Sequence, residues 1–100
     1  MKQPTKLLSY AALAIASTLP LTVSAQPPVG RALAANCFQC HGTDGHAKDG
    51  MPSLAGENIY GDTIEYKRKN DLNDVMVRQA KGYTDAQIAD IAKYFASIPK

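Results

Sequence analysis

The C-terminal part of the chain has the clearest helical pattern of hydrophobic positions. Apolar residues recur there three or four positions apart, so they would share the buried face of one helix: Ile88, Ile91, Ala92 and Phe95. Thr84 and Gln87 have the spacing of a capping box, in which Thr84 caps the helix and Gln87 reaches back to it. This pattern predicts a helix over residues 85–97 that ends before Pro99.

Two earlier segments also favour helices. Residues 29–41 (VGRALAANCFQCH) place Leu33 and both cysteines of the chain along one stripe. Residues 72–81 form the second segment, which Gly82 ends. The apolar side of that segment is predicted to comprise four residues: Leu72, Val75, Met76 and Ala80.

The segments between these helices are polar. Residues 42–56 are rich in Gly, Asp, Ser and Pro, which predicts a long loop. A loop of that length in a compact domain usually has a function, such as wrapping around a ligand. Residues 57–70 form a second polar stretch, and no segment shows the alternation expected of a strand. The fold is therefore predicted to be all-α, with helices joined by long loops.

The chain begins with the three-part pattern of a secretory signal peptide. Two lysines precede an uncharged run, residues 7–19, and small residues follow it up to Ala25. The run is shorter than the roughly 20 residues that cross a membrane, which favours a cleaved leader over a retained membrane anchor. We therefore expect residues 1–25 to be a cleavable signal peptide for export to the periplasm. Membrane attachment is expected only if this segment is not cleaved.

The remaining chain, residues 26–100, is expected to form a single domain. It is small enough that a metal, a disulfide or a cofactor would add needed stability. Two of the eleven Lys and Arg residues would leave with the signal peptide, so nine basic residues would balance nine acidic ones. This balance gives no indication of a nucleic-acid partner.

Both cysteines stand beside a histidine in the motif C-x-x-C-H, formed by Cys37, Cys40 and His41. On a helix these positions share one face, and the motif is the attachment signature of c-type haem. Each thiol can form a thioether with one haem vinyl group, while the imidazole reaches the iron from the same side. Covalent attachment would keep the cofactor bound to a protein too small to enclose it.

Three other chemistries for the cysteine pair agree less well with the sequence. A disulfide across two intervening residues would constrain the unfolded chain little. A thioredoxin-like redox pair would have a βαβ pattern around it, which this sequence lacks. A zinc site would need about four ligands, but His46 is the one other histidine and there is no third cysteine.

From Leu33 to Phe95 the chain resembles the class I c-type cytochromes that carry a single haem, with CFQCH as the specific element. The resemblance implies a small cytochrome c fold, in which helices and long loops wrap around one covalently attached haem c. It also implies thioethers at Cys37 and Cys40, with His41 as an axial ligand of the iron.

The segment MPSLAG, residues 51–56, resembles a segment of the same family that follows the haem motif. In that family the carbonyl of a proline accepts a hydrogen bond from the ligand imidazole. Pro52 stands at the matching place, so its carbonyl is expected to fix the orientation of the His41 ring.

Two methionines outside the signal peptide, Met51 and Met76, are candidates for the opposite axial position. A Met ligand opposite His raises the reduction potential of a c-type cytochrome. Met76 lies 35 residues after His41, where the family places its distal ligand, and the resemblance therefore favours Met76. The alternatives are a Met76 that only packs within its helix, His46 as the ligand, or an open sixth position for gas binding or peroxide chemistry.

Residues 76–96 (MVRQAKGYTDAQIADIAKYFA) are similar to the end of the cytochrome subunit of flavocytochrome c sulfide dehydrogenase. The similarity lies in a capped helix that ends in Tyr94 and Phe95 and in six residues before it: Met76, Arg78, Ala80, Lys81, Gly82 and Tyr83. Before Met76 the chain departs from that family, because an apolar helix is expected there and the sequence is polar (YGDTIEYKRKND).

The resemblance implies a periplasmic electron carrier that is not an enzyme on its own. Its redox partner would be a sulfide-oxidising flavoprotein, and the alternative is a free carrier that serves a terminal oxidase or reductase. A haem sensor or enzyme with an open sixth position is a third hypothesis. A group of basic residues is either a docking patch for the partner or an ordinary solvated stretch: Lys67, Arg68, Lys69, Arg78 and Lys81.

Overall fold

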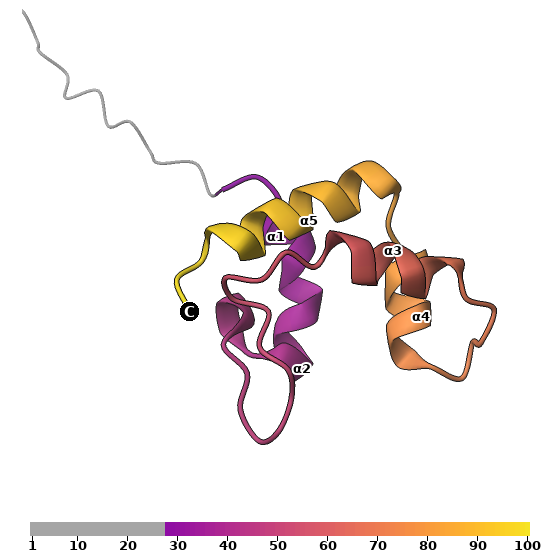
Figure 1. Cartoon of the computed structure of the whole chain (residues 1–100), viewed down its shortest axis with the longest axis horizontal. Coiled ribbons are helices and arrows are strands. Elements are labelled where there is room, and N and C mark those ends of the chain that lie inside the picture. The colour runs from indigo at the N-terminus through magenta and orange to yellow at the C-terminus, as the bar shows by residue number, and fades with distance from the viewer. Residues whose placement is uncertain (1–27) are drawn as a thin grey trace, which may run out of the picture.

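The computed structural model describes residues 28–100, which form helices and loops without a strand (Figure 1). The elements are α1 (Arg31–Ala34), the 3₁₀-helix η1 (Ala35–Cys37), α2 (Phe38–His41), the 3₁₀-helix η2 (Thr43–Gly45), α3 (Tyr60–Arg68), α4 (Val75–Lys81) and α5 (Asp85–Ser97). The predicted all-α class is confirmed.

The expected signal peptide, residues 1–25, lies outside the described residues. None of the helices in residues 28–100 has the length and apolar character needed to cross a membrane.

The helix expected over residues 29–41 is present as a continuous helical run from α1 to α2. It begins at Arg31 rather than at Val29, because Gly30 has a left-handed backbone with a φ of 90°. The run tightens into the 3₁₀ turn η1 before it continues as α2. Cys37 ends this tighter turn, and Cys40 and His41 lie in α2.

Helix α5 has the predicted bounds, Asp85–Ser97, and its N-terminus carries the predicted capping box. The Thr84 hydroxyl accepts a hydrogen bond from the Gln87 backbone at 3.1 Å, and the Gln87 side chain accepts one from the Thr84 backbone at 2.9 Å. All four predicted apolar residues of α5 are buried: Ile88, Ile91, Ala92 and Phe95. Tyr94 is buried as well.

The prediction for the helix around Met76 was partly wrong. Helix α4 begins at Val75, where the Asp74 side chain caps it by accepting a hydrogen bond from the Met76 backbone at 2.8 Å. Leu72 and Val75 are 61% and 52% exposed, so they do not belong to the buried face. The residues of α4 that are buried are Val77 and Ala80. These two lie one turn apart, and α4 packs against α3.

Helix α3 lies within the polar stretch of residues 57–70, where the hydrophobic pattern gave no helix. Ile64 is the one buried residue of this helix, so no repeated apolar positions were available to predict it. Helix α3 packs against both α4 and α5.

The hydrophobic core forms where α1 crosses α5. Four buried residues make up its centre: Ala34, Ile91, Tyr94 and Phe95. In Figure 1, α5 extends from the side of α1 and α2 to the side of α3 and α4. This helix therefore connects the half of the molecule that contains the C-x-x-C-H motif with the half that contains Met76.

The crossing requires a glycine at position 30. A Cβ atom on Gly30 would lie 2.2 Å from the backbone oxygen of Asp90 in α5, closer than any real contact. Gly30 also has a positive φ, which residues with a side chain seldom adopt.

We predict that Gly30→Ala lowers the free energy of unfolding far more than Gly50→Ala does. Gly50 has a similar φ of 81°, but a Cβ atom added to it would have nothing within 4 Å, so it reports the backbone strain alone. That strain is about 1–2 kcal/mol, and the clash at Gly30 should add at least about 2 kcal/mol. Guanidinium unfolding of the haem-loaded protein measures both variants. Equal losses would show that the contact with α5 does not limit the residue at position 30.

Candidate haem site

The two cysteines and His41 lie together at the end of the N-terminal helical run. Both cysteines are free thiols, with Cys37 partly buried and Cys40 exposed. Burial raises the pKa of the Cys37 thiol. His41 is only 8% exposed, and it is the one buried polar or charged residue among residues 28–100.

The ring of His41 has one defined polar partner, the backbone carbonyl of Pro52. The distance from Nδ1 of His41 to this oxygen is 2.8 Å. A carbonyl can only accept a hydrogen bond, so Nδ1 carries the proton and donates it. The lone pair of the neutral ring is therefore on Nε2, the nitrogen that remains available to bind a metal. The hydrogen bond expected from the MPSLAG segment is thus present in the structure.

The loop that supplies the Pro52 carbonyl is attached to the rest of the protein on both sides of that residue. Before Pro52, the backbone of Ala47 donates to the Ser53 hydroxyl at 3.1 Å. After it, the Leu54 backbone donates to the Gly45 carbonyl at 2.8 Å. Further along, the Gly56 backbone donates to the carbonyl of Phe95 in α5, also at 2.8 Å. Two backbone–backbone bonds and one bond to a serine hydroxyl thus fix the loop on both sides of Pro52.

Gly45 is buried where this loop meets α5. A Cβ atom there would lie 2.7 Å from the Ala55 nitrogen and 2.9 Å from the ring of Phe95. The absence of a side chain therefore lets the turn after His41 approach both the loop and the core.

A polar cluster that no local sequence pattern indicates fixes the turn after His41. Asp44 accepts hydrogen bonds from the Tyr94 hydroxyl and from Arg31 Nε, the latter at 3.3 Å. The guanidinium of Arg31 also lies 5.7 Å from the centre of the Phe38 ring. The cluster joins α1, η2 and α5 through residues that are distant in sequence. The Tyr94 hydroxyl, with a further contribution from Arg31, lowers the pKa of Asp44, whereas burial and the Asp44 carboxylate raise the pKa of Tyr94.

We predict that Asp44→Asn makes the stability of the protein less sensitive to acid. Because the pKa of Asp44 is lowered in the folded state, its contribution is present above its unfolded pKa of about 3.9 and is lost as the pH falls through the lowered value. Asparagine tolerates the positive φ of 55° at this position, so the change removes mainly the charge.

Guanidinium unfolding from about pH 7 down to about pH 2, well below the unfolded pKa, measures the effect. The variant should be less stable than the wild type at neutral pH and should lose less stability in acid. Parallel curves for the two proteins would contradict the assignment of this acid-sensitive contribution to Asp44.

The two candidate methionines lie in different surroundings. Met76 is partly buried in the first turn of α4. Met51 is 42% exposed and, with Cys40 and His46, lines an open groove of about 630 Å³ beside α2. Helix α4 packs against α3. Among residues 28–100, helices α2 and α4 do not form a closely packed pair. The structure thus brings Cys37, Cys40, His41 and Pro52 together, and it places Met76 on the other half of the molecule.

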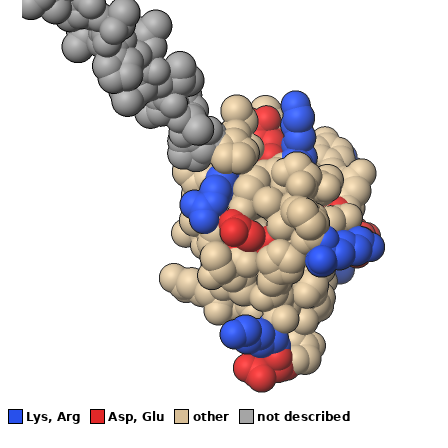
Figure 2. All heavy atoms as spheres, turned by 90° about the vertical axis from the view of Figure 1, so that its left-hand side faces the viewer, with Lys and Arg blue, Asp and Glu red and all other residues tan. Residues whose placement is uncertain are grey.

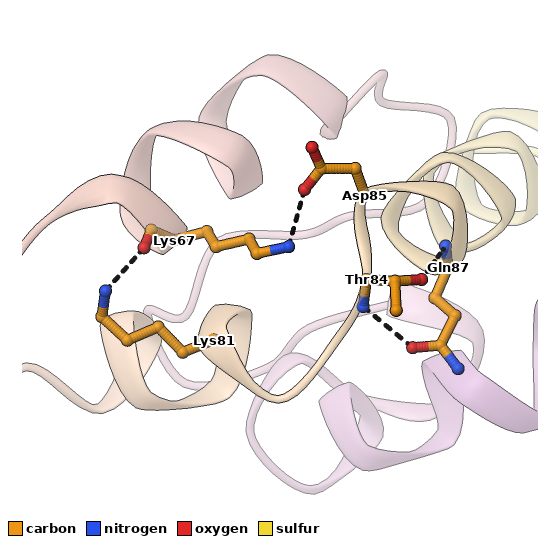
Figure 3. A network of polar contacts seen from close by, with 5 residues as sticks. All are labelled: Lys67, Lys81, Thr84, Asp85 and Gln87. Carbon is orange, nitrogen blue, oxygen red and sulfur yellow. Dashed lines mark hydrogen bonds and ion pairs between the residues drawn. The ribbon is translucent and has the colours of Figure 1, made fainter.

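Three of the five basic residues considered as a docking patch, Lys67, Arg78 and Lys81, make polar contacts within the protein, and Figure 3 shows those of the two lysines. Lys67 lies 2.6 Å from the Asp85 carboxylate, and its hydrogen bond lowers the pKa of Asp85. Lys81 donates to the Lys67 carbonyl at 2.7 Å, and Arg78 donates to the Leu72 carbonyl. These contacts hold α3, α4 and the start of α5 together, which favours a structural role for the lysines.

The face turned to the left in Figure 1 also lacks a patch of one charge sign. Figure 2 shows few charged side chains on this face, and each group of Lys or Arg lies close to an acidic group. Electrostatic steering by a strong field of one sign has no support on this face.

The zinc alternative for the cysteine pair is not supported in the part of the chain that the structure describes. No group of three or more His, Cys, Asp or Glu residues lies close enough together to hold a metal ion there. Cys37, Cys40 and His41 instead follow one another along one short helical segment, as two free thiols and an imidazole whose Nε2 has no hydrogen-bond partner among residues 28–100. This donor set fits a covalently attached haem.

The family model described as "Cytochrome C oxidase, cbb3-type, subunit III" matches residues 26–95, which include the whole candidate site. The chain belongs to this family of c-type cytochromes. It is therefore an electron-transfer protein with covalently attached haem c, as expected from the motif, and not an enzyme on its own.

Individual relatives agree with this assignment. The chain is 39% identical over 92 residues to the "Cytochrome subunit of sulfide dehydrogenase" of Chlorobaculum tepidum, an alignment that covers 85% of this chain and 84% of that protein. It is 37% identical over 75 residues to the "Cytochrome c4" of Pseudomonas aeruginosa, covering 68% of this chain and 36% of that protein. It is 36% identical over 66 residues to the "Cytochrome c-552" of Acidithiobacillus ferridurans, covering 62% and 28%. The chain thus spans about a third of the length of the last two relatives.

Proposed function

We propose that this cytochrome carries single electrons in the periplasm on one haem c with His/Met axial ligation. Cys37 and Cys40 would form the thioethers, and His41 and Met76 would bind the iron. Bound there, haem c supplies one-electron chemistry between the ferric and ferrous states. The observation that carries the proposal is the 2.8 Å hydrogen bond from His41 Nδ1 to Pro52, since it leaves Nε2 free to act as a ligand.

The Pro52 carbonyl supports this role in a second way. It orients a buried imidazole, and a hydrogen bond from Nδ1 makes the other nitrogen a stronger donor. Because the loop is attached through backbone groups to η2 and α5, the ring has little freedom to rotate. The protein therefore supplies a fixed and electron-rich ligand.

The choice of Met76 as the sixth ligand is supported by its position in the structure. It stands in the first turn of α4, whose N-terminus is fixed by the Asp74 cap. Its side chain is only partly buried although two other residues of α4, Val77 and Ala80, are packed inside. Met76 is thus not among the residues of α4 that the fold buries completely. Met51 precedes the residue that bonds to His41, and we therefore assign it to the same side of the ring as Pro52.

We further propose that residues 1–25 are removed after export and that residues 26–100 form the mature domain. The support is the charged, apolar and small-residue order of the first segment. The family match, which begins at residue 26, agrees with this division.

For the redox partner we propose a flavoprotein that oxidises sulfide. The support is the 39% identity to a protein named as the cytochrome subunit of sulfide dehydrogenase, which extends over 84% of that relative. The second candidate is a free periplasmic carrier for an oxidase or reductase. It is favoured by the similarity to proteins named cytochrome c4 and cytochrome c-552.

We predict that Met76→Ala converts the haem from low-spin to high-spin and allows carbon monoxide to bind the ferrous protein. The wild type should be low-spin in both oxidation states and should not bind carbon monoxide. Visible spectra of the mature protein, produced with haem-attachment machinery, measure these properties.

Met51→Leu is the matched control for this experiment, because it removes the other candidate sulfur while it keeps a similar volume. It should leave the spectrum unchanged. If Met51→Leu instead gives the high-spin form, Met51 is the ligand. If the wild type binds carbon monoxide readily, the sixth position is open and the sensor or enzyme hypothesis takes precedence.

The partner proposal predicts a stable complex with a sulfide-oxidising flavoprotein encoded in the same genome. When the two are produced together, they should elute as one species in size-exclusion chromatography. Sulfide should then reduce the haem within that complex. Separate elution, with no haem reduction by sulfide, would support the free carrier instead.

A further inference from the structure

Tyr83 connects the two halves of the molecule through its hydroxyl group. The hydroxyl donates to the carbonyl of Leu33 at 3.0 Å and accepts a hydrogen bond from the Asn36 side chain, also at 3.0 Å. Leu33 is in α1, and Asn36 is in the 3₁₀ turn η1, directly before Cys37. A tyrosine hydroxyl can donate once and accept as well, so both bonds can form together.

Tyr83 is attached to the helix that carries the proposed distal ligand. It follows the C-terminal end of α4 by two residues, and its backbone N–H donates to the Ala80 carbonyl at 3.3 Å. Met76 is in the first turn of the same short helix. A displacement of Tyr83 away from η1 would therefore move α4, and Met76 with it.

The other polar contacts of α4 do not link it to the half of the molecule that carries the haem motif. Lys81 bonds to the Lys67 carbonyl in α3, and the Met76 backbone bonds to Asp74 in the preceding turn. Among the side-chain hydrogen bonds of residues 28–100, the Tyr83 pair is the connection between the region of α4 and the α1–η1 segment.

We propose that Tyr83, together with Asn36, is the positioning residue that keeps Met76 at the haem iron. The inference rests on the proposed function, since it requires Met76 to be the ligand. The two hydrogen bonds hold α4 at a fixed distance from the turn that ends in Cys37. When they are lost, α4 has more freedom to move relative to η1, and the population without a Met76–iron bond increases.

The substitution Tyr83→Phe isolates the hydroxyl. The ring of Tyr83 packs against the hydrophobic core formed by α1 and α5, and phenylalanine retains this packing. Asn36→Ala is a second variant, because it removes one of the two bonds and leaves the bond to Leu33. Tyr60→Phe is the matched control, since Tyr60 is exposed and its hydroxyl makes no hydrogen bond to residues 28–100.

The experiment is a titration of the ferric, haem-loaded protein with imidazole, which binds only when the distal position is vacant. The apparent affinity for imidazole therefore reports the fraction of protein in which Met76 has dissociated. We expect about 3- to 10-fold tighter binding for Tyr83→Phe, a smaller change for Asn36→Ala and no change for Tyr60→Phe. The midpoint potential of Tyr83→Phe should also fall, because Met ligation raises it.

Guanidinium unfolding of the same variants separates this role from a purely structural one. A loss of stability in Tyr83→Phe without a change in imidazole affinity or in midpoint potential would overturn the inference. The Met76→Ala spectrum tests the proposed function separately. If Met76→Ala leaves the spectrum unchanged, both proposals fail, whereas a changed Met76→Ala with an unaffected Tyr83→Phe rejects only the role of Tyr83.

Discussion

The close contact between Gly30 and the backbone of α5 is the constraint on which the rest of the structure depends. It lets α1 cross α5 at a distance that no side chain at position 30 would permit. The crossing buries Ala34 against Ile91 and the two aromatic residues of α5. It also sets the start of the helical run that ends, about three turns later, at the three residues of the haem motif.

From this crossing, two sets of polar contacts extend to the surroundings of His41. One is the cluster of Arg31, Asp44 and Tyr94, which attaches the turn after His41 to both crossing helices. The other is the set of backbone bonds that holds the loop around Pro52. Both act on segments that have little regular structure of their own. They therefore provide the rigidity that a single buried imidazole needs in a small protein.

The sequence predicted the parts of the fold in which local signals agree. Helix α5 combined a capping box with regular apolar spacing, and its bounds were correct. The haem motif was recognised because its chemistry depends on neighbouring residues.

Helix α3 was missed because Ile64 alone is buried, so the helix depends on tertiary contacts that a short window of sequence does not contain. For α4 the pattern selected Leu72 and Val75, whereas the direction of packing against α3 buries Val77. The Tyr83 hydroxyl accepts from Asn36 and donates to Leu33, and the Tyr94 hydroxyl donates to Asp44. Each of these bonds joins residues about fifty positions apart, which no local pattern indicates.

The way the loop of residues 47–56 is attached also has a consequence for the evolution of this protein. Its anchoring bonds lie on either side of a tip formed by Lys48, Asp49 and Gly50, which are all exposed. A Cβ atom added to Gly50 would have no neighbour within 4 Å, so there is open space at the end of the tip. Insertions and deletions are best tolerated at such tips. The length of this loop can therefore vary between descendants of the same gene, while the Gly45 carbonyl and the Ser53 hydroxyl keep the Pro52 carbonyl directed at the histidine.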